Sequence, residues 1–172
     1  MKKGTGKYDK NKAAVCGLFC PSCTLFIGTQ EDPQRLQRLS GVLKLPVEDI
    51  RCEGCRAELR SFFCREYCKM VKCAAEKGIE FCGSCESYPC QELKDFQCAM
   101  PHRIELWESL DRIQEAGPET WYGEMLKHYA CPSCGTINSA YDLQCRKCGG
   151  EPGCRYVAEH RDEIIRQLGK MQ

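Results

Sequence analysis

The chain has 172 residues, and 17 of them are cysteine, a density typical of small proteins held together by disulfides or metal ions. The formal net charge is +1, and residues 16–130 carry more acidic than basic side chains, so we expect no phosphate-gripping surface there. Without its cysteines the chain is only about one third apolar, too little for a large core, and no run approaches the roughly 18 apolar residues of a membrane span.

The amino-terminal segment, residues 1–14, is predicted to be a solvated basic tail. No apolar stretch follows it, so no export signal is visible, and we expect a cytoplasmic protein. Thiols stay reduced in the cytoplasm, and an odd number of cysteines cannot all form disulfides. We therefore interpret the cysteines as metal ligands.

The predicted fold is a small, irregular α+β protein stapled by metal ions, with short helices, cysteine knuckles, a carboxyl-terminal zinc ribbon and a closing helix. The predicted parts after the tail are a cysteine-rich metal-binding domain at 15–99, a helical connector at 100–130, the ribbon at 131–150 and a carboxyl-terminal helix at 151–172.

The first predicted helix begins at Pro33 with Asp32 as its cap, and its apolar face contains Leu36, Leu39 and Leu43. A second helix-like run extends over residues 64–78 and would place Cys64 and Cys68 on one face.

Three further helices are predicted toward the carboxyl end. Residues 101–116 form an amphipathic helix with an apolar face of leucine and isoleucine, and residues 118–129 follow as a shorter helix. The closing helix is expected to dock against the body through its apolar side chains. The residues assigned to these apolar faces are Leu106, Leu110 and Ile113, then Trp121, Met125 and Tyr129, then Tyr156, Ile164, Ile165 and Leu168.

The clearest chemical motif is CPSCGTINSAYDLQCRKCG, in which two C-x2-C pairs are separated by ten residues. Each pair can place two thiolates on one ion while backbone N–H groups donate to the sulfurs. Four protein ligands close a tetrahedron and leave no position for a substrate or an activated water. The spacing therefore predicts a structural zinc site.

Twelve more cysteines between positions 16 and 98 divide evenly into three four-thiolate sites, which leaves Cys154 unassigned. One economical grouping joins the pair 20/23 with 52/55, and the pair 82/85 with two of the cysteines at 64, 68, 73 and 90. The sixteen predicted ligands, of about four zinc ions, are Cys16, Cys20, Cys23, Cys52, Cys55, Cys64, Cys68, Cys73, Cys82, Cys85, Cys90, Cys98, Cys131, Cys134, Cys145 and Cys148.

Several assignments stay open at this point. Cys16 and Cys98 are equally well explained as buried small hydrophobic residues. His102 could complete a Cys3His site after Cys98, although a solvent-facing helix start is the favoured interpretation. Thiolates alone do not distinguish zinc from iron, so iron–sulfur clusters in the amino-terminal domain, for electron transfer or redox enzyme assembly, are the alternative cofactor.

Two resemblances concern single motifs. The C-x3-C-x2-C spacing of Cys16, Cys20 and Cys23 is that of radical S-adenosylmethionine enzymes, but the alternating strands and helices of such enzymes are missing from the sequence. The ribbon resembles zinc fingers of the Ran-binding-protein type, in which an Asn follows the second Cys by four positions, as Asn138 does here. That resemblance implies binding of single-stranded RNA or ubiquitin, and Tyr129 stands where those fingers have Trp.

A longer resemblance covers residues 15–96. It is carried by the Cys-Gly-Leu opening at 16–18, Cys-x-Gly-Cys at 52–55, the Cys-Ala-x-x-Lys-Gly motif at 73–78 and Tyr-Pro-Cys at 88–90. In order and spacing these motifs resemble a prokaryotic cysteine-rich family, the domain of unknown function numbered thirty-seven ninety-five. A three-residue gap between Cys64 and Cys68 departs from the two-residue knuckle of that pattern. The resemblance implies a metal-binding module, commonly taken as zinc, and supplies no substrate.

For function, we expect a cytoplasmic multi-zinc protein that acts as a non-catalytic interaction or scaffold module with a protein partner. No small-molecule substrate and no membrane are inferred, and the sequence leaves an enzymatic activity open. RNA binding through the ribbon is a less favoured alternative, and metal storage or sensing is another.

Overall fold

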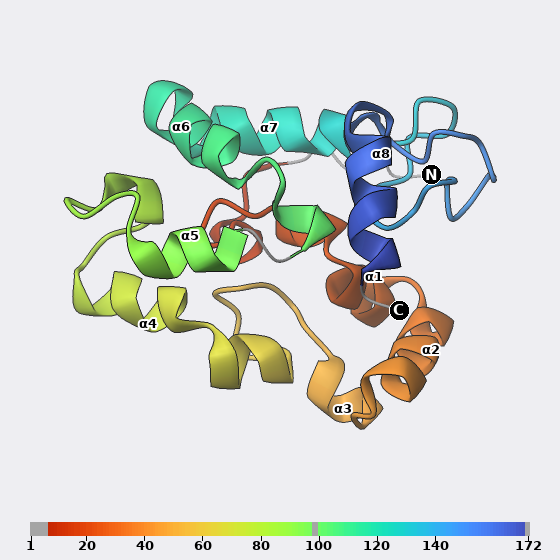
Figure 1. The fold of residues 1–172 in the computed structure, drawn as a ribbon, viewed down its shortest axis with the longest axis horizontal. Helices are drawn as coiled ribbons and strands as arrows, with labels where there is room; N and C mark the ends of the chain where they lie inside the picture. Colours follow the sequence, from red (N-terminus) through yellow and green to blue (C-terminus); the bar gives the residue numbers. More distant parts are fainter. Residues whose placement is uncertain (1–6, 98–99, 171–172) are drawn as a thin grey trace.

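The computed structural model describes residues 7–97 and 100–170, which fold into eight α-helices joined by loops and short turns (Figure 1). The helices are α1 (Thr24–Gln30), α2 (Pro33–Leu43), α3 (Val47–Ile50), α4 (Lys69–Glu76), α5 (Gln91–Gln97), α6 (Leu106–Ala116), α7 (Pro118–His128) and α8 (Arg155–Gly169). Short 3-10 turns are η1 (Lys10–Lys12), η2 (Cys20–Ser22), η4 (Cys82–Ser84) and η5 (Pro101–Arg103), and η3 (Phe63–Tyr67) is a single π-helical turn.

The predicted α+β class overstates the β component. In the described ranges the extended structure amounts to two isolated antiparallel bridges, Ala13 with Phe19 and Ala130 with Ile137. Each bridge closes a loop beside a cysteine segment, and neither has a neighbouring strand with which a sheet could form. The protein is therefore mostly helical.

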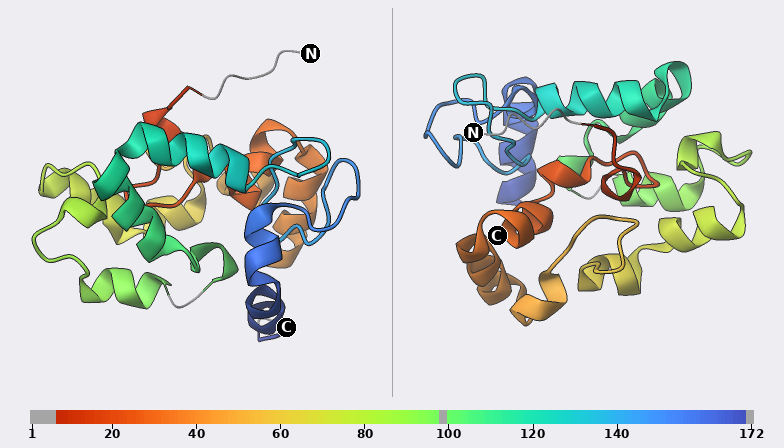
Figure 2. Two further views of the ribbon diagram at one scale, coloured as in Figure 1. Left: turned by 90° about the horizontal axis from the view of Figure 1, so that it is seen from above. Right: turned by 180° about the vertical axis from the view of Figure 1, so that it is seen from behind.

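Figure 1 shows how the helices are arranged. Helices α6 and α7 pack against each other along the top of the view, α4 and α5 lie at the left, and α1 to α3 lie at the lower right. The loops of residues 130–154 extend beyond α8 (Figure 2), and the ion pair of Asp142 with Arg35 joins them to α2. Among the described helices none is long and apolar enough to cross a bilayer.

Local signals set the ends of these helices. Asp32 caps α2 by accepting a hydrogen bond from the backbone N–H of Arg35 at 3.0 Å, and Pro33 occupies the first position, as predicted. Gly117, at a φ of +83°, ends α6, and Pro118 begins α7.

The predicted helix over residues 64–78 is interrupted. Cys64 lies in η3, and Cys68 is extended, with φ −79° and ψ 106°, before α4 begins at Lys69. The two cysteines therefore do not share one regular helix face. Cys68 donates its backbone N–H to the carbonyl of Phe63, five residues back, and this π-type hydrogen bond closes the turn before the extended residue.

An aromatic core joins the two ends of the chain. Trp121 and Tyr156 have no exposed surface, and Tyr129 lies between Phe19 and Tyr156. Ring centroids are 5.8 Å apart for Phe19 and Tyr129 and 5.0 Å apart for Tyr129 and Tyr156, in stacked orientation. The predicted core roles of Trp121 and Tyr129 are confirmed.

The closing helix was predicted to dock through Tyr156, Ile164 and Ile165, among others. Tyr156 and Ile164 have no exposed surface, as predicted, but the prediction is wrong for Ile165, which is 47% exposed. Adjacent helical positions point about 100° apart, so the face that buries Ile164 turns its neighbour toward solvent.

The described part of the basic segment reaches the core. Ala13 and Ala14 are buried, and the Arg56 side chain donates to the carbonyl of Ala13 at 2.9 Å. Gly54, at a φ of +129°, contacts the carbonyl of Asn11 so closely that a Cβ atom would overlap it. The glycine of the 52–55 knuckle therefore lets the amino-terminal segment pack against the cysteine loops.

Candidate metal centres

Two matching turns build the carboxyl-terminal cysteine group. In each, the glycine after the second cysteine has a positive φ, +73° at Gly135 and +71° at Gly149. Gly135 and Gly149 each donate the backbone N–H to the carbonyl of the first cysteine, Cys131 or Cys145, at 2.9 Å. The repeated Cys-x2-Cys-Gly sequence therefore folds each pair into a tight knuckle by local geometry alone.

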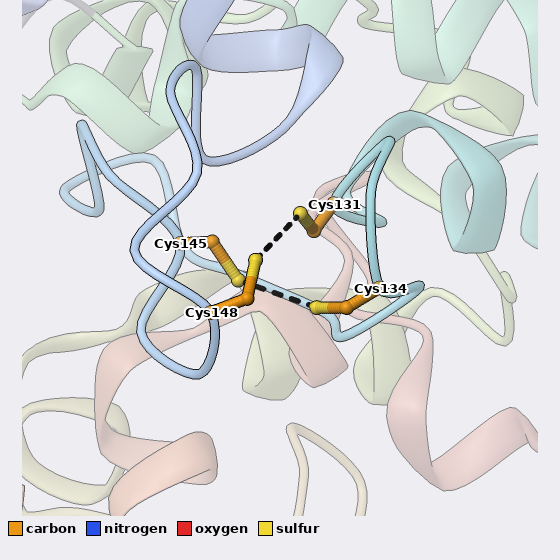
Figure 3. Close-up of side chains that lie close together, drawn as sticks. All are labelled: Cys131, Cys134, Cys145 and Cys148. Atoms are coloured by element: carbon orange, nitrogen blue, oxygen red, sulfur yellow. Dashed lines mark hydrogen bonds between the residues drawn. The ribbon is translucent and has the colours of Figure 1, made fainter.

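The four sulfurs of Cys131, Cys134, Cys145 and Cys148 converge and all lie within 4.8 Å of one another (Figure 3). The sulfur atoms of Cys131 and Cys148 are 3.7 Å apart, and those of Cys134 and Cys145 are 3.6 Å apart. Zinc–sulfur bonds of about 2.3 Å in a tetrahedron would place the sulfurs about 3.8 Å apart. The group, which we call the ribbon centre, could therefore hold one metal ion.

Asn138 connects the two turns of the ribbon centre. It has no exposed surface, and its amide donates to the carbonyl of Gly153 at 2.7 Å and to the Cys145 sulfur at 3.6 Å. Burial alone would raise the pKa of the Cys145 thiol, but backbone hydrogen bonds from Cys148 and Lys147, together with Asn138, lower it to about 6. Cys145 is therefore prepared to bind as a thiolate.

A second group of four cysteines lines an apolar cavity of about 80 Å³, and we call it the cavity centre. Cys73 comes from α4, Cys82 and Cys85 from the segment around η4, and Cys90 from the residue before α5. The sequence left open which two of the cysteines at 64, 68, 73 and 90 join the pair 82/85. The structure places Cys73 and Cys90 beside that pair. Among the described residues, the ribbon centre is the group of cysteines whose sulfurs all lie within 4.8 Å of one another. The four sulfurs of the cavity centre are more widely spaced.

Charge in the cavity centre is partly compensated. The Lys77 ammonium group donates to the Cys85 sulfur at 3.1 Å. Hydrogen bonds from the Ser87 backbone and from Lys77 lower the pKa of the Cys85 thiol. Burial, followed by the negative charge of the Cys90 and Cys73 thiolates, raises the pKa of Cys82 to about 12. A cation in the cavity would remove that repulsion.

The remaining described cysteines gather around the loop of residues 16–23. The backbone N–H of Cys55 donates to the Cys20 sulfur at 3.4 Å, so the first knuckle contacts the second. Burial and neighbouring thiols raise the pKa of Cys16 and Cys20 well above the usual range, that of Cys23 to about 12 and that of Cys55 to about 11.

The other predicted ligands of this part of the chain also lie near the loop. Thiolates at Cys52 and Cys64 would repel Cys23, and a thiolate at Cys68 would repel Cys16. This set of seven cysteines offers dense, mutually repelling sulfur ligands, a chemistry that divalent cations stabilise. Cys98, the twelfth predicted ligand, lies outside the described residues.

The structure also places Cys154, which the sequence left unassigned, and His102, for which the sequence favoured a solvent-facing position. Cys154 is fully buried just before α8, and this burial is the main reason why its pKa is raised to about 11. The thiol therefore packs as a small hydrophobic residue. His102 lies in η5 rather than at a solvent-facing helix start, and its Nδ1 is 2.7 Å from the Tyr141 hydroxyl.

The sequence pattern gave no sign of one polar cluster. Glu105, just before α6, accepts hydrogen bonds through its carboxylate from His128, the last residue of α7, and from His160, in the second turn of α8. These residues are separated by up to 55 positions and form no short motif, so their meeting depends on the packing of the helices.

Comparison with known proteins gives one match. Residues 12–95 match the family described as "Protein of unknown function (DUF3795)". No curated protein and no solved structure matches the chain. The match covers the cavity centre and the described cysteines of the amino-terminal loops, and it ends before α6, α7, the ribbon centre and α8.

Proposed function

We propose that this chain is a cytoplasmic multi-zinc protein in which zinc ions are structural, and that it serves as a non-catalytic interaction or scaffold module for a protein partner. The ribbon centre carries the proposal. Four converging cysteine sulfurs, with spacings of 3.6 and 3.7 Å, fit one tetrahedral ion and leave no open coordination position. A closed site of this kind stabilises a fold and binds no substrate.

Zinc is favoured over iron by the form of the donor set. Two knuckles with backbone and Asn138 hydrogen bonds aimed at sulfur are typical of mononuclear tetrahedral sites, and intact ferredoxin spacings are absent from the sequence. The cavity centre, where four cysteines line a space of about 80 Å³, is the candidate for a second zinc ion, which would draw its more widely spaced sulfurs together.

A protein partner is favoured over RNA because of the contacts of the ribbon's arginine. Arg146 is 13% exposed, donates to the carbonyl of Ile137 at 2.9 Å and forms an ion pair with Glu31. An arginine committed to two internal partners is not free to bind phosphate. Of the two basic side chains in the ribbon, Lys147 alone would then remain for a nucleic acid.

The proposal is tested by counting zinc, iron and sulfide per chain in anaerobically purified protein. About four zinc ions and a colourless solution are expected, from sixteen cysteines at four per site. Cys145→Ser should lose one zinc ion, whereas Cys154→Ala, which removes the buried thiol assigned to no site, should keep them all. Iron with sulfide and visible absorption would replace this proposal with a redox function.

Lys77 should strengthen metal binding at the cavity centre. Replacing it with Met removes the hydrogen bond to the Cys85 sulfur, and groups that hold a ligand from outside the coordination shell typically contribute about 10–100-fold to metal affinity. A comparable loss of zinc affinity is expected in competition with a chromophoric chelator. Lys72→Met is the matched control, because Lys72 lies on α4, which ends just before Lys77, and pairs with Glu76 rather than with sulfur. Equal affinities in the two variants would contradict the assigned role.

A further inference from the structure

Three helices bring two imidazoles to one carboxylate outside the cysteine centres. Glu105 immediately precedes α6, His128 is the last residue of α7, and His160 lies in the second turn of α8. The Glu105 Oε1 atom is 2.9 Å from the His128 Nε2 atom and 2.6 Å from the His160 Nε2 atom. The three side chains are 18%, 12% and 23% exposed, respectively, so the cluster is largely shielded from solvent.

The surrounding rings hold the imidazoles in place. The Tyr156 ring contacts both histidines edge to face, with centroid distances of 5.7 Å to His128 and 4.9 Å to His160. Tyr156 is itself fully buried, and its hydroxyl donates to the carbonyl of Pro101 at 2.5 Å. The two nitrogen atoms are therefore positioned by the core rather than by flexible surface side chains.

A second carboxylate is close by. One ligand atom from each of Glu105, Glu159 and His160 lies within 4.8 Å of the other two. Glu159 is 41% exposed and pairs with the Nε atom of Arg155, which is itself 73% exposed. An exposed pair of this kind stabilises the fold by about 1 kcal/mol or less, so a cation could recruit Glu159 at little cost.

The charge state of the buried carboxylate also suits a cation. Burial alone would raise the pKa of Glu105, but hydrogen bonds from His128 and His160 and their positive charge lower it overall. Hydrogen bonds to two imidazoles therefore favour the carboxylate form of Glu105.

We propose that Glu105, His128 and His160, with Glu159 as a fourth ligand, bind a divalent first-row transition-metal ion. Imidazole nitrogen with carboxylate oxygen is a ligand set suited to Zn²⁺ and Fe²⁺, and it is harder than the thiolate sets. A bound ion takes the place of the hydrogen atoms between the two Nε2 atoms and Glu105, and each neutral imidazole ligand then carries its proton on Nδ1. All four residues lie outside the segment 12–95, and the site is independent of which metal the sulfur centres hold.

Cobalt distinguishes this site from the cysteine centres, because only sulfur ligands give a sulfur-to-cobalt charge-transfer band. Metal-free full-length protein is titrated anaerobically with Co²⁺, and bound cobalt is counted after gel filtration. We expect one further ion to bind after the charge-transfer band has saturated. Glu105→Gln and His160→Gln should each lose that ion and leave the band unchanged, whereas the control Glu163→Gln on the same helix should keep it.

The wild-type protein supplies a second readout that does not depend on the folding of any variant. Once the sulfur band has saturated, the ring proton signals of His128 and His160 should shift or broaden again in nuclear magnetic resonance spectra as the further cobalt ion binds. Binding that stops when the sulfur band saturates would overturn the proposal. A further ion that both variants retain, or that leaves the two histidine signals unchanged, would also overturn it.

Discussion

Removal of bound metal with a strong chelator under reducing conditions is expected to abolish the cooperative thermal unfolding of this protein. A structural zinc site contributes about 10–16 kcal/mol of apparent folding free energy, and a whole domain of this size is typically stable by only about 5–15 kcal/mol. The loss of even one ion therefore removes an amount comparable to the entire stability. Circular dichroism and calorimetry before and after chelation measure the effect.

Zinc addition to the chelated protein is the control, since it should restore the melting transition if the thiols have stayed reduced. A metal-free chain that keeps its helical signal and its melting transition would contradict this expectation. In that case the aromatic core around Trp121 would be sufficient for folding, and the cysteine loops would be accessory to it.

Replacement of Arg35 by Met is expected to destabilise the metal-bound protein by about 3–5 kcal/mol. The Arg35 guanidinium, 10% exposed, makes two hydrogen bonds to the Asp142 carboxylate, at 2.8 and 3.2 Å, and also contacts Asp32 and Thr24. Asp142 is 13% exposed and would be left largely buried without its cation. Urea unfolding of the wild-type and variant proteins at fixed zinc concentration measures the difference.

Arg38 provides the matched control on the same helix. Its side chain is 65% exposed and lies 3.8 Å from Asp32, so Arg38→Met should cost about 1 kcal/mol or less. The double replacement Arg35→Met with Asp142→Leu should cost less than the sum of the two single replacements, because no unpaired charge remains. If Arg35→Met cost no more than Arg38→Met, the buried pair would have no special role.

Features encoded by neighbouring residues were predictable from the sequence. The start of α2 follows from Asp32 and Pro33, and the division between α6 and α7 follows from Gly117 and Pro118. The convergence of the ribbon cysteines follows from two identical Cys-x2-Cys-Gly turns separated by a short loop. In each case a few adjacent residues determine the geometry.

Features that depend on distant residues were not predictable. Arg35 and Asp142 are 107 positions apart, and neither residue has a neighbour that identifies its partner. The division of the amino-terminal cysteines is similarly ambiguous, since any C-x2-C pair can join any other and only helix packing places Cys73 and Cys90 at the same cavity. The break at Cys68 was missed because helical periodicity continues across it in the sequence.

The stacked rings of Phe19, Tyr129 and Tyr156 couple parts of the protein that sequence comparison separates. Phe19 precedes Cys20 within the family-matched segment, Tyr129 lies two residues before Cys131, and Tyr156 lies two residues after Cys154. Metal ions bound in the amino-terminal loops and in the ribbon centre would therefore order opposite sides of one shared stack. We therefore expect, by thermodynamic linkage, that occupancy of one region raises the metal affinity of the other, so that the proposed metal ions bind cooperatively.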